Sequence, residues 1–168
     1  MIFFRTFCTI ILSAAKCKNS SAQEPKNCNW KKGSTDMLHF ELQRASDKLI
    51  REVFAVKKDE VVVITADTGS DMELVHAVAS SVYAAGAKPM VITIVAPDGV
   101  GKAADAGIPV DCLTGALLHC DVWIEFNHQW LLYSTPFERA IDGNKKMRYM
   151  CLVDVDCALL TRGVGKVE

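Results

Sequence analysis

The chain has 168 residues, of which 50% are hydrophobic and 23% are charged, and its formal net charge is −1 at pH 7. This length and composition fit one globular domain with a substantial core. The balanced charge, with basic residues scattered along the chain, excludes a nucleic-acid-binding face, because such a face needs clustered Lys and Arg.

The first 36 residues differ in character from the rest. An apolar run from Phe7 to Ala15 lies between Arg5 and Lys16 and ends in small residues, as a weak secretory signal does. The run is too short to span a bilayer, so we expect no membrane segment there. Residues 1–36 are therefore expected to be a disordered extension or a weak signal-like leader, with Met37 as an alternative start of translation. We expect a cytoplasmic protein, or an exported one if residues 1–15 act as a signal peptide.

Residues 37–54 carry apolar side chains at helical spacing and predict an amphipathic helix. Residues 60–66 are too apolar for a strand with one wet face, so they predict a central parallel strand covered on both sides. The next helix is expected to begin at Ser70 or Asp71 and to end before Gly86.

The β-branched run in Pro89–Val95 predicts a second buried strand. Pro97–Pro109, rich in Gly and closed by Pro at both ends, predicts a long, mobile excursion. Further helices are expected at residues 111–118, 135–141 and 157–162, and further strands at residues 121–126 and 147–153. This alternation predicts an α/β fold with a doubly wound, mostly parallel open sheet of about four strands and flanking helices.

The four cysteines within this pattern form no CxxC pair and match no zinc-finger spacing. We expect all four to be buried free thiols. They are Cys112, Cys120, Cys151 and Cys157.

The loop after the first strand, residues 66–71, stands where many nucleotide-binding folds hold a phosphate. It has only one glycine, Gly69, and no lysine, and its two carboxylates, Asp67 and Asp71, would repel a phosphate. Ser70 or Asp71 can instead cap the helix that follows, so we predict a capped turn.

In open parallel sheets, ligands bind beyond the carboxyl ends of the strands. The candidate ligand-edge residues are accordingly Asp67, Thr68, Asn127 and His128. The Asp154–Asp156 pair has the spacing of a metal-binding DxD motif, but a helix cap is the favoured interpretation. His39 and His76 have no partner at a metal-binding spacing apart from Glu73 beside His76. No catalytic triad, HExxH motif or metal site can be assembled, so no catalytic or metal-binding residue is predicted.

One stretch resembles a known family. Residues 121–136, DVWIEFNHQWLLYSTP, together with RYMCLV at 148–153, RGVGKV at 162–167 and AAGA at 84–87, resemble the N-terminal domain of the thermophilic metallo-aminopeptidases. That superfamily contains leucyl aminopeptidase and aminopeptidase T, and it also includes 2,5-dihydroxypyridine 5,6-dioxygenase. The resemblance covers roughly residues 37–168.

In that family the metal ligands lie in a second, C-terminal domain, so no ligand position can be carried onto this sequence. The resemblance implies the non-metal-binding N-terminal domain of a metal-dependent aminopeptidase-like enzyme, inactive as this fragment. Its partners would be the missing C-terminal catalytic domain, holding Zn, Co, Mn or Fe, and a second copy in a homodimer. The alternatives are the N-terminal domain of a dioxygenase-like ring-cleaving enzyme and a stand-alone small-ligand-binding or interaction module.

Overall fold

The computed structural model describes residues 35–166, so the leader expected at residues 1–36 lies almost wholly outside the described residues. Four parallel strands form one sheet in the order β2-β1-β3-β4. The strands are β1 (Val61–Asp67), β2 (Lys88–Ile94), β3 (Val122–Glu125) and β4 (Arg148–Cys151). The prediction of a doubly wound, parallel α/β sheet is confirmed.

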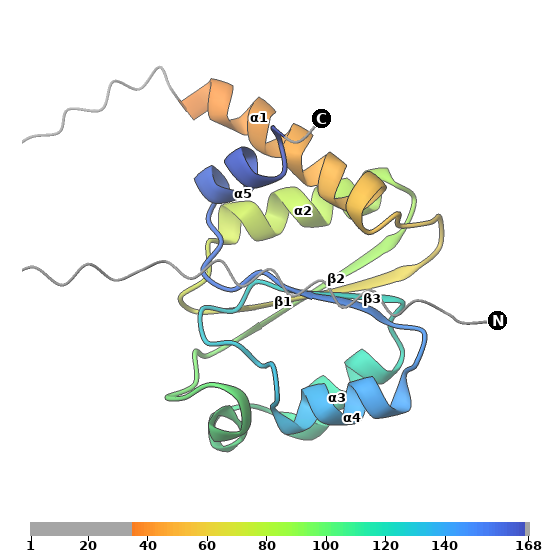
Figure 1. The fold of residues 1–168 in the computed structure, drawn as a ribbon, viewed down its shortest axis with the longest axis vertical. Coiled ribbons are helices and arrows are strands. Elements are labelled where there is room, and N and C mark those ends of the chain that lie inside the picture. The colour runs from red at the N-terminus through yellow and green to blue at the C-terminus, as the bar shows by residue number, and fades with distance from the viewer. Residues whose placement is uncertain (1–34, 167–168) are drawn as a thin grey trace, which may run out of the picture.

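Helices cover both faces of this sheet (Figure 1). One layer holds α1 (Thr35–Lys48), its π-helical extension η1 (Leu49–Val53), α2 (Met72–Ala84) and α5 (Cys157–Gly163). The other layer holds the 3-10 helix η2 (Gly101–Gly107), α3 (Val110–Leu118) and α4 (Thr135–Gly143). No helix within residues 35–166 has both the length and the apolar character needed to cross a membrane.

Alternation along β1 and β3 divides the core into two clusters, because successive strand side chains point to opposite faces. Val62 and Ile64 pack in the cluster under α1, α2 and α5, whereas Val63 packs in the cluster over α3 and α4. Trp123 is the largest fully buried side chain and sits in the second cluster. The uniformly apolar β1 is therefore buried on both faces, as its sequence predicts.

The prediction of a buried second strand is wrong. β2 is an edge strand, and Met90 and Val91 are 47% and 37% exposed. Its β-branched composition favours a strand at any place in a sheet, and it does not report how many neighbours the strand has. Burial of β2 depends on strand order, which local composition does not encode.

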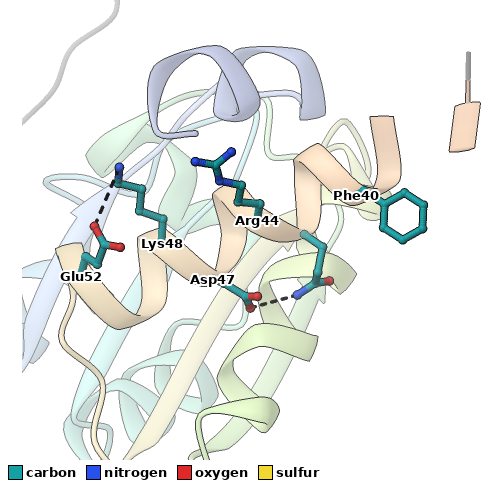
Figure 2. Close-up of a pocket in the computed structure, with 6 residues that line it drawn as sticks. Phe40, Arg44, Asp47, Lys48 and Glu52 are labelled. Carbon is teal, nitrogen blue, oxygen red and sulfur yellow. Dashed lines mark hydrogen bonds and ion pairs between the residues drawn. The ribbon is translucent and has the colours of Figure 1, made fainter. Parts of the chain in front are cut away.

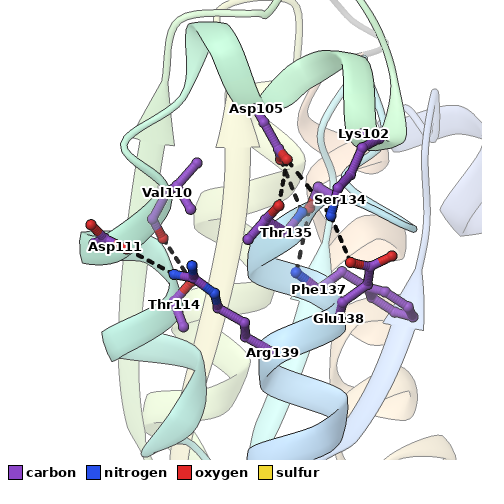
Figure 3. Close-up of polar contacts among 10 residues, drawn as sticks. All are labelled: Lys102, Asp105, Val110, Asp111, Thr114, Ser134, Thr135, Phe137, Glu138 and Arg139. Atoms are coloured by element: carbon purple, nitrogen blue, oxygen red, sulfur yellow. Dashed lines mark hydrogen bonds and ion pairs between the residues drawn. The ribbon is translucent and has the colours of Figure 1, made fainter.

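The excursion predicted at Pro97–Pro109 contains η2, which is tied to the start of α4. The Asp105 carboxylate accepts hydrogen bonds from the Thr135 backbone N–H, at 2.9 Å, and from the Thr135 hydroxyl (Figure 3). Lys102 of η2 forms an ion pair with Glu138 of α4, with 2.6 Å between Nζ and the carboxylate oxygen. Polar contacts of η2 with α4 therefore give this segment a defined path over the sheet.

Cysteine burial follows the prediction only in part. All four described cysteines are free; Cys120 and Cys157 are buried and Cys151 is half-buried. Cys112 is exposed, which corrects the expectation for that thiol. It lies on the outer side of α3, beside Asp111, where apolar content in the sequence does not distinguish the two helix faces.

Candidate functional site

The strand order reverses between β1 and β3, because the chain first moves from β1 outward to β2 and then returns to β3 and on to β4. The carboxyl ends of these two strands therefore form the switch point where ligands enter open α/β sheets. Asp67 ends β1, and Asn127 and His128 follow β3. The sequence-predicted residues thus lie at the edge where the fold favours a site.

Asp67 is fully buried and all its contacts are internal. Its carboxylate accepts hydrogen bonds from the backbone N–H groups of Gly69 and Gln129, at 2.8 and 2.9 Å, and from the Ser70 hydroxyl at 3.3 Å. These bonds join the loop after β1 to the loop after β3. Asp67 therefore shapes the edge of the sheet from inside, and its carboxylate is not presented to solvent.

The other three predicted residues separate into one buried and two exposed side chains. Asn127 is fully buried, and neither its amide nitrogen nor its amide oxygen has a hydrogen-bond partner within the described residues. Thr68 is exposed, and its hydroxyl accepts from the Ala96 backbone N–H at 3.1 Å. His128 is exposed as well.

His128 forms a pair that the sequence does not reveal. Its Nδ1 atom contacts the Asp154 carboxylate, which β4 brings to the same edge from 26 residues away. The two residues line a hollow of about 110 Å³ together with Gly69, Ser70 and Phe126, among others. Gly69 allows the histidine to lie this close, because a Cβ at that position would stand 3.0 Å from the Cβ of His128.

The capped turn predicted in place of a phosphate loop is confirmed. Asp71 is the N-cap of α2, and its carboxylate accepts from the backbone N–H groups of Glu73 and Leu74 at 3.1 and 3.4 Å. Its second oxygen accepts from the Cys157 backbone N–H at 3.1 Å, which ties α5 to α2. Burial pushes the pKa of Asp71 up, but hydrogen bonds from Cys157 and from the helix amides outweigh it and hold that pKa below its usual value.

The Asp154–Asp156 pair likewise follows the capping interpretation. Asp156 is the N-cap of α5 and accepts from the Leu159 backbone N–H at 2.6 Å. Asp154 adopts a left-handed backbone, with φ of 56°, and pairs with His128. The two carboxylates therefore serve different partners.

Within residues 35–166, no three His, Cys, Asp or Glu side chains are arranged to hold a metal ion. Two of the carboxylates around the hollow, Asp71 and Asp156, are engaged by helix amides. Only His128 and Asp154 remain, and they bind each other. The described residues around this hollow thus do not fit a metal centre.

We expect the substitution Asp71→Ala to lower the free energy of unfolding by about 1–2 kcal/mol, because α2 loses its N-cap and α5 loses its tether. Because the pKa of Asp71 is depressed, its stabilisation is fully present above the unfolded-state pKa of about 3.9, and it is lost as the pH falls from there through the lower folded-state pKa. Urea denaturation at neutral and acid pH measures both effects.

Asp142→Ala is the matched control, since the Asp142 side chain is 85% exposed and its polar contact within residues 35–166 is with the nearby Lys145. It should change the stability by no more than about 0.5 kcal/mol. Equal effects of the two substitutions, or a cost of Asp71→Ala that does not shrink in acid, would contradict the capping role.

Sequence reasoning missed a second fully buried acid near the site, Glu125. Glu125 is fully buried on β3, and its carboxyl accepts from the Leu131 backbone N–H and the Tyr149 hydroxyl. Burial raises the pKa of Glu125 against these hydrogen bonds, and the neighbouring Asp67 carboxylate raises it further. Burial and the nearby Glu125 also raise the pKa of Cys151 to about 12. A lone Glu inside the apolar run at residues 122–126 was the available signal.

His39 also has a partner that the sequence analysis did not assign. Its Nδ1 atom lies 3.1 Å from a carboxylate oxygen of Glu73, so α1 rather than His76 contacts this acid. Both side chains are about half exposed, and the pair lies between α1 and α2. It is a surface contact between helices and adds no group to the hollow at His128.

A larger groove of about 410 Å³ lies along α1, between Phe40 and Glu52 (Figure 2). Its walls are mainly charged or polar side chains that pair with one another, such as Lys48 with Glu52 at 3.9 Å and Gln43 with Asp47 at 3.1 Å. Because this groove lies on α1, outside the loops that follow the strands, we place the candidate site at the hollow beside His128.

No family model matches the sequence, and neither does any curated protein. Among solved structures, the fold is similar to 2,5-dihydroxypyridine dioxygenase from Pseudomonas putida KT2440, with a TM-score of 0.61 and 17% sequence identity. That match covers 75% of this chain and 37% of the dioxygenase chain. AmpT from Thermus thermophilus matches with a TM-score of 0.44 and 11% identity, over 76% of this chain and 42% of AmpT. The match to the dioxygenase shows a shared fold.

Proposed function

We propose that residues 37–168 form the non-metal-binding domain of a larger metal-dependent enzyme of this aminopeptidase and dioxygenase superfamily. One observation carries the proposal: the fold covers three quarters of this chain but only 37% of the dioxygenase chain that shares it. The sequence resemblance indicates an enzyme of the aminopeptidase type. The dioxygenase type is a second candidate, because the fold is similar to that of 2,5-dihydroxypyridine dioxygenase with a TM-score of 0.61.

In this role the domain supplies one wall of a cleft at the carboxyl edge of its sheet. The contact between Nδ1 of His128 and Asp154 fixes the imidazole ring and leaves Nε2 as the atom that can meet a ligand. Thr68 and His128 are the exposed members of the predicted ligand edge. Asp67 and Asn127 shape the edge from beneath, because both side chains are buried. The metal and the bond-breaking chemistry belong to the second domain.

The purified 168-residue protein is expected to carry no stoichiometric metal and to turn over neither leucyl substrates nor 2,5-dihydroxypyridine. Elemental analysis and assays of both activities test this directly. The protein translated from a reading frame extended past Glu168 should bind metal and show one of the two activities. Tightly bound stoichiometric metal in the 168-residue chain would sink the proposal, as would an extended reading frame without a metal-binding domain.

A further inference from the structure

The central strands β1 and β3 separate at the carboxyl edge of the sheet. Their ladder is regular as far as Phe126, whose N–H donates to the Thr65 carbonyl at 2.8 Å. One step further, the Ser70 hydroxyl takes the place of a direct backbone bond. It accepts from the Asp67 N–H at 2.8 Å and donates to the Phe126 carbonyl at 2.9 Å. A side-chain oxygen therefore stands between the two backbones, and the strand ends are held apart.

Asn127 lies at this separation with its whole amide group unpaired. Thr65 and Glu125 are partners in the register of the sheet, so Asp67 and Asn127, two residues further on, stand side by side on one face. Asn127 is fully buried, and its Nδ2 and Oδ1 atoms have no hydrogen-bond partner within the described residues. Buried amides in folded proteins are nearly always paired with protein groups or with ordered water. The side chain therefore requires a partner that the described chain does not supply.

The carboxylate beside Asn127 has room for one more donor. Oδ1 of Asp67 is engaged by Gly69 and Ser70, whereas Oδ2 accepts one bond within the described residues, from the Gln129 N–H. A carboxylate oxygen has two lone pairs, so Oδ2 can accept a second bond. The place where the strands separate thus offers a donor on Asn127 and acceptors on both residues.

We propose that a buried water molecule occupies this place, accepting from Nδ2 of Asn127 and donating to Oδ2 of Asp67. Water both donates and accepts, so it serves the two kinds of atom together. A cation would leave Nδ2 without an acceptor, and an anion would meet the Asp67 carboxylate. A buried water needs about two to four polar partners, which these side chains provide. The water joins β3 to β1 beyond the end of their backbone ladder, and this inference does not depend on the proposed function.

The other buried asparagine of the described chain shows the alternative arrangement. Nδ2 of Asn144 donates to the backbone carbonyls of Leu117 and Cys120 at 3.0 and 2.7 Å. There the protein itself surrounds the amide with acceptors, so no water is assigned to it. The difference between the two asparagines is the separation of the strands at Asn127.

Oxygen-17 relaxation dispersion of the solvent tests the site, because it counts water molecules held for longer than the protein takes to tumble. We expect the Asn127→Leu variant to hold one such molecule fewer than the unchanged chain, since leucine removes the amide. Gln129→Leu is the matched control, because it removes a half-buried amide side chain from the same loop and keeps the N–H that binds Asp67. Its count should equal that of the unchanged chain. An undiminished count in folded Asn127→Leu, or the same loss in Gln129→Leu, overturns the proposal.

A crystal structure of the unchanged chain tests the site without any substitution, and it decides the matter if Asn127→Leu does not fold. We expect an ordered oxygen atom about 2.7–3.2 Å from both Nδ2 of Asn127 and Oδ2 of Asp67. A protein group bonded to the Asn127 amide, or a dry gap, would contradict the proposal. So would an atom coordinated only by oxygens at about 2.3–2.6 Å, because those distances indicate a metal cation.

Discussion

Replacing Trp123 with alanine should lower the free energy of unfolding by about 3–5 kcal/mol, the range expected for a buried Trp. The side chain is fully buried between the strands and the α3–α4 layer. Its ring centroid lies 4.4 Å from that of Tyr149 and 6.1 Å from that of Phe137. Its indole N–H donates to the buried Thr65 hydroxyl at 2.9 Å. The truncation therefore opens a cavity and also removes a hydrogen-bond partner inside the core.

Urea denaturation followed by circular dichroism measures this cost without relying on tryptophan fluorescence. Trp130→Ala is the matched control, because Trp130 is 41% exposed on the loop after β3. Its loss should cost less than about 1 kcal/mol. Similar costs for the two substitutions would show that Trp123 is not the centre of the second core cluster.

The second large effect concerns the dependence of stability on pH. Because the folded-state pKa of Glu125 is raised above the unfolded value of about 4.3, the folded protein holds more protons between these two values. The free energy of unfolding contributed by this group is therefore greatest below about pH 4.3 and falls as the pH rises toward the folded-state pKa. One such group changes the slope by at most about 1.4 kcal/mol per pH unit.

Glu125→Gln should remove this decline, because glutamine has the shape of the protonated side chain and stays neutral. Its oxygen can accept from the Leu131 N–H while its amide donates to the Tyr149 oxygen. Urea denaturation at a series of pH values should show the variant gaining on the unchanged protein as the pH rises. Glu52→Gln controls for the loss of one negative charge, because the Glu52 side chain is 66% exposed. Parallel pH profiles for the Glu125→Gln variant and the unchanged protein would contradict the assignment.

The sequence predicts the elements of this fold well where local physics decides them. β1 is apolar on both faces and is central, and Asp71 and Asp156 cap the helices that follow them. A cap depends on the few residues around it, so its signal is present in a short window. The burial of β2 depends on which strand lies beside it, and that information is spread over the whole chain.

The candidate site was also predictable only in part from the sequence. Strand ends can be located from sequence, so the sequence predicts that Asp67, Thr68, Asn127 and His128 lie at one edge of the sheet. Which of them faces solvent depends on how the loops after the strands fold, and the structure buries Asp67 and Asn127. The pairing of His128 with Asp154 needs β3 and β4 to be neighbours, so no local pattern indicates it. Ligand contact at these residues remains a prediction.

The loop after β3 is fixed through its backbone, and this determines which of its residues can change without altering its path. Asp67 and Glu125 bind the loop through the backbone N–H groups of Gln129 and Leu131, so the identities of those two side chains do not set its path. Trp130 and Tyr133, 41% and 65% exposed, project from this fixed backbone. Side chains at the rim can thus be exchanged during evolution or by engineering without rebuilding the loop. A loop with a fixed backbone and variable exposed side chains allows one fold to bind different ligands.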